Sequence, residues 1–359
     1  MRAFLTATAM GFASILFTFD ATIPVLHLPD YHNEQTRSDF LQKMEKAAVE
    51  VGFFALTGTG VDVETLNQAY DETKKYFALD REEKMALLTK DGQRGYVPGE
   101  SAKGEKRIDY KEFFHVGREL SDPDLKRLGY GKNVWPTNPE GFRPAMQRLY
   151  EALDVCKEAM GEAFAAVLNQ DPQFINQMIH EGNSLLRAIH YPANPPAQAI
   201  WAGAHTDINL FTILPRSTAR GLQLCNQQGE WLDVIVPDGA FVINCGDMLE
   251  NLTNGYFRSA LHRVVDPGLG EERFSMTFFV HPCSTDRLDP LPQYIEKTGG
   301  TRLYANVSAL ELLAERLIDL GLASRQLMEF FVQSGAIEKL KEVGRYSPKA
   351  EEALDKAGF

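Results

Sequence analysis

The sequence predicts a mainly β protein with flanking helices, in which a jelly-roll core lies between two partly helical regions. The first observation is a series of about eight short apolar runs between residues 184 and 283, separated by turn residues. The second is that apolar residues recur at helical spacing before and after this series. Short strands in such a series indicate a sandwich or barrel, for which a jelly roll is a natural candidate. The runs are 185–191, 200–204, 209–214, 221–225, 231–236, 240–244, 260–265 and 274–280.

Residues 23–170 are expected to form a mixed α/β region that precedes the core. Its apolar runs at 23–28 and 52–57 predict strands. Apolar residues at helical spacing predict helices over 38–51, over 63–77 and within 139–170. The segment 91–111 is rich in Gly, Lys and Glu and shows no sustained period, so we expect it to form a long surface loop.

The two ends of the chain differ in character. Residues 284–359 return to a helical pattern, with leucines at 310, 313, 317 and 320. Residues 1–22 form an apolar N-terminal extension, because no charged residue lies between Ala3 and Phe19. This run resembles the apolar part of a signal peptide, yet one arginine precedes it and no small-x-small cleavage site lies before Asp20. We therefore expect a segment that packs on the domain and a cytoplasmic protein, with export as the alternative.

Composition and charge narrow the class of partner. The chain has 359 residues, a formal net charge of -12 and a sequence pI near 5.2. An acidic chain of this kind lacks the basic face that nucleic acids and anionic membrane surfaces require, so we expect neither partner. The four cysteines are scattered and form no Cys-x-x-Cys pair, which indicates reduced thiols rather than a disulfide framework or a zinc knuckle. A monomer or weak oligomer that binds a small-molecule substrate is expected.

A candidate metal site lies within the strand series. His205 and Asp207 begin one predicted strand, and residues two apart in extended chain face the same side. His262, on a later strand, supplies a third ligand. Two imidazoles and one carboxylate on one face of an octahedral metal are typical of iron(II) oxygenases, in which three positions stay open. A rival pair of the same spacing, His32 and Glu34, lies outside the strand series and is interpreted as surface.

A second pair of polar residues follows the third ligand. Arg273 and Ser275 are two residues apart on a predicted strand, so both side chains face one side. An arginine and a hydroxyl together can hold a carboxylate. Alternation along the same strand turns the side chain of Phe279 to this side as well.

These motifs, in this order, resemble those of the iron(II)/2-oxoglutarate-dependent dioxygenase superfamily, in its isopenicillin N synthase-like branch. The likeness extends over most of the chain after residue 22. The segments that match the family's β-core are Gly203-Ala-His-Thr-Asp, Gly221-Leu-Gln-Leu, Asn244-Cys-Gly-Asp-Met, Ser259-Ala-Leu-His-Arg-Val and Arg273-Phe-Ser. Segments before the core that resemble the family are Ile23-Pro-Val-Leu, Gly52-Phe-Phe, Arg94-Gly-Tyr and Tyr110-Lys-Glu-Phe-Phe.

The resemblance implies a double-stranded β-helix core and a set of residue roles. His205, Asp207 and His262 would bind Fe(II), while Arg273 and Ser275 would bind the distal carboxylate of the cosubstrate 2-oxoglutarate. Tyr191 matches a tyrosine that contacts the cosubstrate in many relatives, although their asparagine two residues earlier is Ile189 here. With O2 as the oxidant, the expected reaction is hydroxylation, desaturation or cyclisation of a small organic metabolite.

The sequence also allows other interpretations of the function. The chain could be an isopenicillin N synthase-type iron oxidase that does not use 2-oxoglutarate, because Arg-x-Ser could hold a substrate carboxylate instead. It could also be a non-catalytic metal- or ligand-binding jelly-roll protein, or a zinc hydrolase, since the ligand set alone does not determine the metal. Candidate substrate contacts are Arg94, Tyr96 and Phe279. His115 and His281 have no partner pattern and are expected to be structural.

Overall fold

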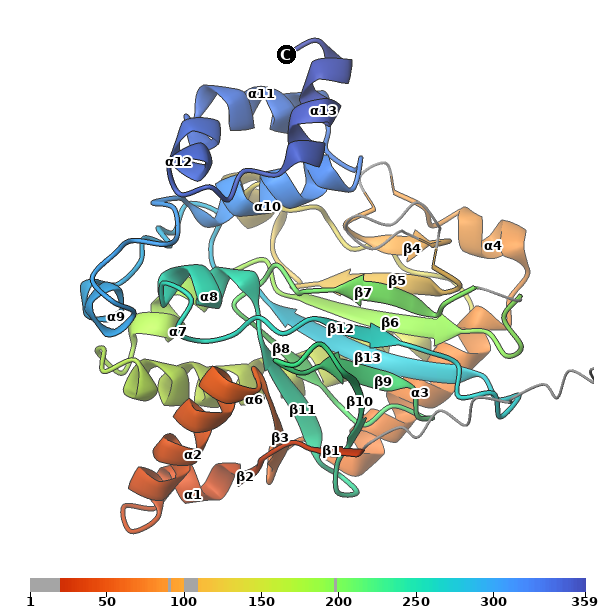
Figure 1. The fold of residues 1–359 in the computed structure, drawn as a ribbon. Helices are drawn as coiled ribbons and strands as arrows, with labels where there is room; N and C mark the ends of the chain where they lie inside the picture. The colour runs from red at the N-terminus through yellow and green to blue at the C-terminus, as the bar shows by residue number, and fades with distance from the viewer. Residues whose placement is uncertain (1–19, 90–91, 100–108, 197–198) are drawn as a thin grey trace, which may run out of the picture.

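The computed structural model describes residues 20–89, 92–99, 109–196 and 199–359, which form two β-sheets with helices around them (Figure 1). One sheet has five strands in the order β1-β10-β9-β12-β7, and the other has eight in the order β2-β3-β11-β8-β13-β6-β5-β4. The strands are β1 (Asp20–Thr22), β2 (Val25–His27), β3 (Phe53–Thr57), β4 (Gly95–Val97), β5 (Glu112–Gly117), β6 (Leu185–Tyr191), β7 (Ala202–His205), β8 (Phe211–Leu214), β9 (Leu222–Cys225), β10 (Trp231–Ile235), β11 (Phe241–Cys245), β12 (His262–Val264) and β13 (Arg273–Val280).

The jelly-roll core consists of the strands β6 to β13, divided between the two sheets. Strands β11, β8, β13 and β6 are neighbours in the larger sheet, and β10, β9, β12 and β7 are neighbours in the smaller one. Successive strands of the chain thus alternate between the two sheets, except for β9 and β10, which pair with each other in the smaller sheet, as in a double-stranded β-helix. Each of the eight apolar runs predicted from the sequence overlaps one of these strands, so the predicted mainly β fold class with a jelly-roll core is confirmed.

Strands from the N-terminal part of the chain extend the larger sheet on both sides. β3 pairs antiparallel with β11, and β5 pairs antiparallel with β6. The strand predicted at 52–57 is therefore confirmed. The long surface loop predicted over 91–111 is wrong in part, because β4 lies within it and pairs with β5 at the edge of the sheet. The apolar residues 1–19 of the N-terminal extension lie outside the described residues.

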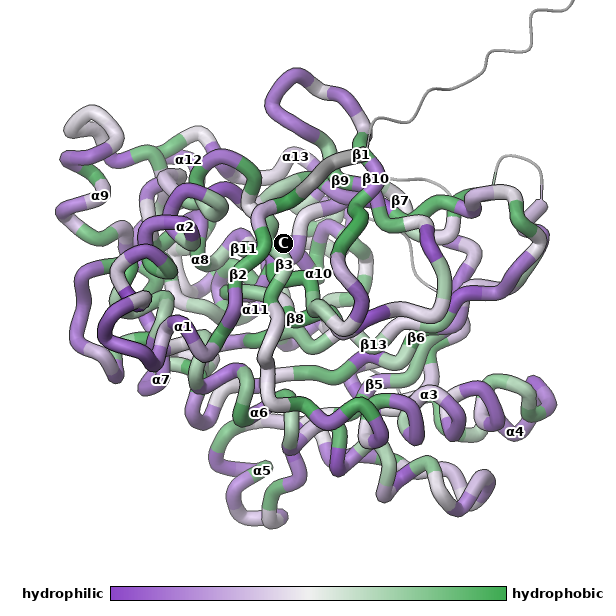
Figure 2. Tube along the Cα trace, turned by 90° about the horizontal axis from the view of Figure 1, so that it is seen from below, coloured by the Kyte–Doolittle hydropathy of each residue, from purple (hydrophilic) through white to green (hydrophobic). Residues whose placement is uncertain are grey.

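Helices cover the outer face of the larger sheet. α3 and α6 pack on one another, and the ring of Tyr150 in α6 contacts Phe278 of β13 at 5.1 Å between centroids. The polar outer turns of α1 and α4 contrast with the apolar strands at the centre of Figure 2. The helices are α1 (Leu28–His32), α2 (Arg37–Glu50), α3 (Val63–Phe77), α4 (Arg81–Met85), α5 (Asp122–Leu128), α6 (Phe142–Val167), α7 (Phe174–Ile179), α8 (Asp247–Leu252), α9 (Pro292–Lys297), α10 (Ala309–Asp319), α11 (Arg325–Gln333), α12 (Ala336–Glu342) and α13 (Pro348–Ala357).

The helices predicted over 38–51, 63–77 and 139–170 correspond to α2, α3 and α6. Local signals define their ends: the side chain of Asp62 accepts a hydrogen bond from the backbone N–H of Thr65 at the start of α3. The C-terminal helices α10 to α13 gather at one end of the molecule (Figure 1), and α10 begins with a capping box formed by Ser308 and Glu311. Among the described residues, no helix has the length and apolar character to cross a membrane.

The packing of α6 on the core leads to a stability prediction. Phe164 is fully buried and its ring lies 4.9 Å from that of Phe211 in β8. We expect Phe164→Ala to lower the free energy of unfolding by about 3–5 kcal/mol, because the change removes a buried ring and leaves a cavity. Urea denaturation would measure it. Val155→Ala, at a 70% exposed position of the same helix, is the control and should change stability by less than about 0.5 kcal/mol. A similar small loss for Phe164→Ala would contradict the packing described.

Candidate metal centre

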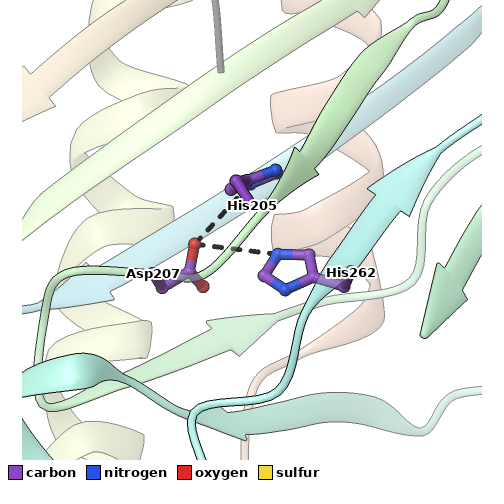
Figure 3. A group of neighbouring side chains, drawn as sticks. All are labelled: His205, Asp207 and His262. Atoms are coloured by element: carbon purple, nitrogen blue, oxygen red, sulfur yellow. Dashed lines mark ion pairs between the residues drawn. The ribbon is translucent and has the colours of Figure 1, made fainter. Parts of the chain in front are cut away.

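A cavity between the two sheets brings together most of the residues singled out in the sequence. Strand β7 pairs antiparallel with β12, and this pairing sets His205 directly opposite His262. Asp207 follows β7 by two residues and faces the same side as His205. Figure 3 shows both imidazole rings turned toward the Asp207 carboxylate. The cavity is lined by these three side chains together with Tyr191, Arg273 and Ser275.

The three side chains offer ligand atoms that converge. Nε2 of His205 lies 3.8 Å from Oδ1 of Asp207, and Nε2 of His262 lies 3.7 Å from the same oxygen. One ligand atom from each of the three residues lies within 4.8 Å of the others. Within the described part of the chain, no other group of three His, Cys, Asp or Glu side chains converges in this way. The spacing suits a single metal ion bound by all three residues.

Backbone contacts orient both imidazoles for metal binding. Nδ1 of His205 lies 2.7 Å from the carbonyl oxygen of Gly203, and Nδ1 of His262 lies 3.0 Å from that of Ala260. A carbonyl oxygen only accepts, so the proton of each neutral ring is on Nδ1. The Nε2 lone pair of each ring is thereby available to a metal. The ring of Phe53, 5.4 Å from that of His262, packs against the second imidazole.

The carboxylate of Asp207 is held in the same manner. Its Oδ2 accepts hydrogen bonds from Thr212 Oγ1 at 2.6 Å and from Asn244 Nδ2 at 2.8 Å, which leaves Oδ1 toward the histidines. Burial alone would raise the pKa of Asp207, but the two histidines and these hydrogen bonds lower it to about 2. Burial, reinforced by the neighbouring His262, lowers the pKa of His205 to about 3. At neutral pH the cluster therefore offers a carboxylate and a neutral imidazole at His205.

A buried arginine lies at another end of the cavity. Arg273 is 1% exposed, and its Nε donates to the carbonyl oxygen of Ala219 at 3.1 Å. Its Nη1 has no hydrogen-bond partner among the described residues, which is costly for a buried cation. The guanidinium lies 4.9 Å from the ring centre of Tyr191, its cross-strand neighbour on β6. Ser275, also 1% exposed, lies on the same side of β13. The arrangement suits a ligand carboxylate.

The loop between His205 and Asp207 is fixed by a helix from the C-terminal region. Arg316 of α10 is buried, and its Nη1 donates to the carbonyl oxygen of Thr206 at 2.9 Å. Its Nη2 bonds to the carboxylate of Asp247, which also accepts from the hydroxyl of Thr206 at 3.1 Å. The backbone N–H of Asp247 donates to the carbonyl oxygen of Asp207 at 2.7 Å. These contacts restrain the backbone on both sides of Thr206, and nothing in the local sequence pattern of α10 indicated them.

The three candidate substrate contacts lie in different places relative to the cavity. Phe279 lines the cavity, as expected of its place on β13. Arg94 and Tyr96 do not line it. The hydroxyl of Tyr96 donates to Glu112 at 2.6 Å, because the alternation of β4 and β5 turns both side chains to the outer face of the sheet. Arg94 is 2% exposed and donates to the side chain of Asn183 at 2.7 Å.

Sequence reasoning missed two cations that line the cavity, Lys111 and Arg187. Lys111 forms a buried ion pair with Asp109 at 2.8 Å and lay in a predicted loop, where no periodicity indicates a facing direction. Strand alternation could have predicted the direction of Arg187, because it is four residues from Tyr191 on β6 and so faces the same side.

Comparison with known proteins agrees with this geometry. Residues 23–138 match the family described as non-haem dioxygenase in morphine synthesis N-terminal, and residues 182–282 match the 2OG-Fe(II) oxygenase superfamily. Azadirone synthase LFS of Melia azedarach is 35% identical over 256 residues, which are 67% of this chain and 76% of that protein. A 2-oxoglutarate-dependent dioxygenase of Didymella fabae is 31% identical over 289 residues, 72% of this chain and 87% of that protein.

A solved structure is similar over much the same length. The crystal structure of a 2OG-Fe(II) oxygenase family protein from Caulobacter crescentus has a TM-score of 0.75 and 35% identity, and the match covers 82% of this chain and 98% of that one. A jelly roll with a His-Asp-His cluster defines the class of mononuclear non-haem iron enzymes. The chain belongs to the 2OG-Fe(II) oxygenase superfamily.

The protein is accordingly an iron(II)- and 2-oxoglutarate-dependent dioxygenase that uses O2 as oxidant. The family resemblance, the enzyme class and the cofactors predicted from the sequence are confirmed. The relatives give no support to the alternatives, namely an oxidase without 2-oxoglutarate, a non-catalytic binding protein or a zinc hydrolase.

The contacts of Arg316 lead to a prediction about metal affinity. We expect Arg316→Ala to raise the iron(II) dissociation constant by roughly 10–100-fold, because the backbone between the first two ligands loses its restraint. Anaerobic equilibrium dialysis measures this, and Arg316→Lys should recover part of the affinity. Arg325→Ala, at an exposed position of α11, is the control. An unchanged dissociation constant in folded Arg316→Ala protein would show that the α10 contacts do not position the ligands.

Proposed function

We propose that His205, Asp207 and His262 hold the catalytic iron(II), and that Arg273 and Ser275 hold the distal carboxylate of 2-oxoglutarate beside Tyr191. One observation carries the proposal: the converging ligand atoms and an unpartnered nitrogen of a buried arginine line the same cavity. A metal ion bound by the converging ligand atoms and a dicarboxylate bound by the arginine would account for both features. The substrate is proposed to be a small organic molecule that enters this cavity and is hydroxylated, desaturated or cyclised.

The donor set supports iron in this position. Two imidazoles and a carboxylate suit iron(II), and three ligands on one face leave positions for a chelating cosubstrate and O2. The hydrogen bonds that Nδ1 of each histidine donates and that Oδ2 of Asp207 accepts set the ring and carboxylate orientations before a metal arrives. Iron(II) bound here would supply O2 activation coupled to the oxidative decarboxylation of 2-oxoglutarate.

The surroundings of Arg273 favour a carboxylate as the ligand at this end of the cavity. A guanidinium whose Nε is bound to Ala219 and whose plane lies over Tyr191 is held in one orientation. Its Nη1 then donates to an incoming carboxylate without further ordering, and the hydroxyl of Ser275 can add a second hydrogen bond. A charge-assisted bond of this kind is strong in a cavity with apolar walls, which are contributed by Phe53, Ile189, Leu214, Leu222 and Val264. The same walls exclude water from the reacting groups.

The wider setting is also proposed. Residues 184–283 carry the metal and cosubstrate, while 23–170 and 284–359 support and enclose the site. The net charge of -12 favours a protein that works without nucleic acid or an anionic membrane surface. All four cysteines are free, which favours a reducing, cytoplasmic setting. A monomer or weak oligomer is proposed.

The role of Arg273 is tested by anaerobic titration of the iron(II)-loaded protein with 2-oxoglutarate. We expect a weak visible metal-to-ligand charge-transfer band in the wild type, and a 2-oxoglutarate dissociation constant raised by about 10-fold or more in Arg273→Ala, because a charge-assisted bond is lost. Arg345→Ala is a matched control, since Arg345 also lies over a tyrosine ring and donates through Nε to a backbone carbonyl, outside the cavity. An unchanged 2-oxoglutarate dissociation constant in Arg273→Ala would refute the assignment of Arg273 to the cosubstrate.

The role of Asp207 is tested by metal analysis. We expect Asp207→Ala to lower iron(II) affinity by more than about 100-fold, because loss of a ligand should exceed the roughly 10–100-fold cost of losing an outer partner. Succinate formation should fall to background. Glu45→Ala, which removes a carboxylate far from the cavity, is the control. Stoichiometric iron in folded Asp207→Ala protein would rule out this ligand.

A further inference from the structure

The cavity holds a second arginine, Arg187, at some distance from Arg273. On the paired strands β6 and β13, Tyr191 is opposite Arg273 and Arg187 is opposite Thr277. Arg187 is therefore four residues from the Arg273 end, which is about 13 Å along a strand. Ile189 and Ser275 form the cross-strand pair between the two ends. Both arginines line the same cavity, and no role has yet been given to Arg187.

Aromatic rings and a histidine hold Arg187 in one orientation. Its guanidinium carbon lies 4.3 Å from the ring centre of Phe113 and 5.0 Å from that of Phe279. Its Nε donates to Nε2 of His115 at 2.7 Å. Nδ1 of His115 lies 2.8 Å from the carbonyl oxygen of Gly92 and so carries the ring proton, which leaves Nε2 as the acceptor. The arginine is half-buried, so its position is fixed while a molecule in the cavity can still reach it.

The strand register places the two arginines toward different ends of the cavity, which favours two ligands over one. The end carbons of 2-oxoglutarate are about 5 Å apart, since four carbon–carbon bonds join them. A cosubstrate that spans from Arg273 to a metal at the His-Asp-His cluster has no further carboxylate for a residue at the Arg187 end. Phe279, which lines the cavity beside Arg187, offers apolar surface, unlike the tyrosine and serine beside Arg273. The Arg187 end is therefore suited to a different molecule.

We propose that Arg187 binds a carboxylate of the prime substrate, whose apolar carbon skeleton lies against Phe279. This inference rests on the proposed function, in which Arg273 is occupied by 2-oxoglutarate. A guanidinium fixed by stacking and by its Nε matches the planar, two-oxygen geometry of a carboxylate better than it matches a neutral amide. The contact would place the substrate between Arg187 and the metal cluster. It would also make the enzyme selective for amphipathic acids.

The test uses matched probes with the intact iron(II)-loaded protein and 2-oxoglutarate under anaerobic conditions. The probes are 3-phenylpropanoate, 4-phenylbutanoate and 5-phenylpentanoate, each paired with its primary amide. Isothermal titration calorimetry gives the affinity of each probe, and the visible charge-transfer band reports the cosubstrate. We expect the acids to bind about 10-fold or more tightly than the amides in the wild type.

Variants at position 187 test whether Arg187 causes the preference for acids over amides. Arg187→Met should bring the acids to the affinity of their amides and leave the 2-oxoglutarate band unchanged. Arg187→Lys, which keeps the charge without the fork, should retain part of the preference. Arg345→Met serves as the control, because it removes an arginine stacked on Tyr304 outside the cavity.

Each other outcome overturns the inference. Acids that bind no better than amides, including the case in which neither binds, show that the cavity has no carboxylate site. An acid preference that survives in Arg187→Met assigns the site to another residue. Loss of the 2-oxoglutarate band in Arg187→Met assigns Arg187 to the cosubstrate. Absence of the band in the iron-loaded wild type would instead refute the proposed function, whereas the calorimetric preference would still report on Arg187.

Discussion

The antiparallel pairing of β7 with β12 is the contact on which the metal cluster depends. It sets His205 opposite His262, and the extended chain after His205 brings Asp207 to the same side. Because side chains alternate along a strand, a slip of one residue in this pairing would turn one imidazole away from the other. The pairing of β12 with β9 on its other edge fixes the same register from a second strand. Strand pairing thus sets the positions of the two imidazoles, and side-chain hydrogen bonds from Thr212 and Asn244 hold the Asp207 carboxylate.

The same alternation organises the opposite wall of the cavity. Along β6 the inward positions are occupied by Arg187, Ile189 and Tyr191, while His190 points to the other face. There His190 contacts Glu112, and its ring stacks on Phe274 at 4.7 Å between centroids. One strand therefore provides a polar network on its outer side and two ends of a binding cavity on its inner side. The pairing with β13 adds Arg273 at one end of that cavity and Phe279 near the other.

The parts that could be predicted from the sequence were those with a local signal. Helix α3 occupies 63–77 as its apolar spacing indicated, and β6 occupies 185–191. The three metal-cluster residues could be singled out because strand alternation and residue type together restrict the possibilities. Strand β5 lacked such a signal, since its place in the sheet is set by pairing with β6, far along the chain. The outward direction of Tyr96 follows from the pairing of β4 with β5, and Lys111 lies just before β5, so neither direction could be predicted.

The site is consequently a product of the whole chain and is not confined to the jelly-roll core. Phe53 from β3 packs on a metal-cluster imidazole, and Phe113 from β5 stacks on the arginine of the cavity wall. Arg316 from α10 restrains the loop between His205 and Asp207. The core strands set the histidines opposite one another, while the flanking regions add the ring beneath Arg187 and the restraint on that loop. The proposed chemistry thus depends on the pairing of core strands, whereas the proposed substrate end of the cavity combines Arg187 and Phe279 of the core with support from Phe113 of a flanking strand.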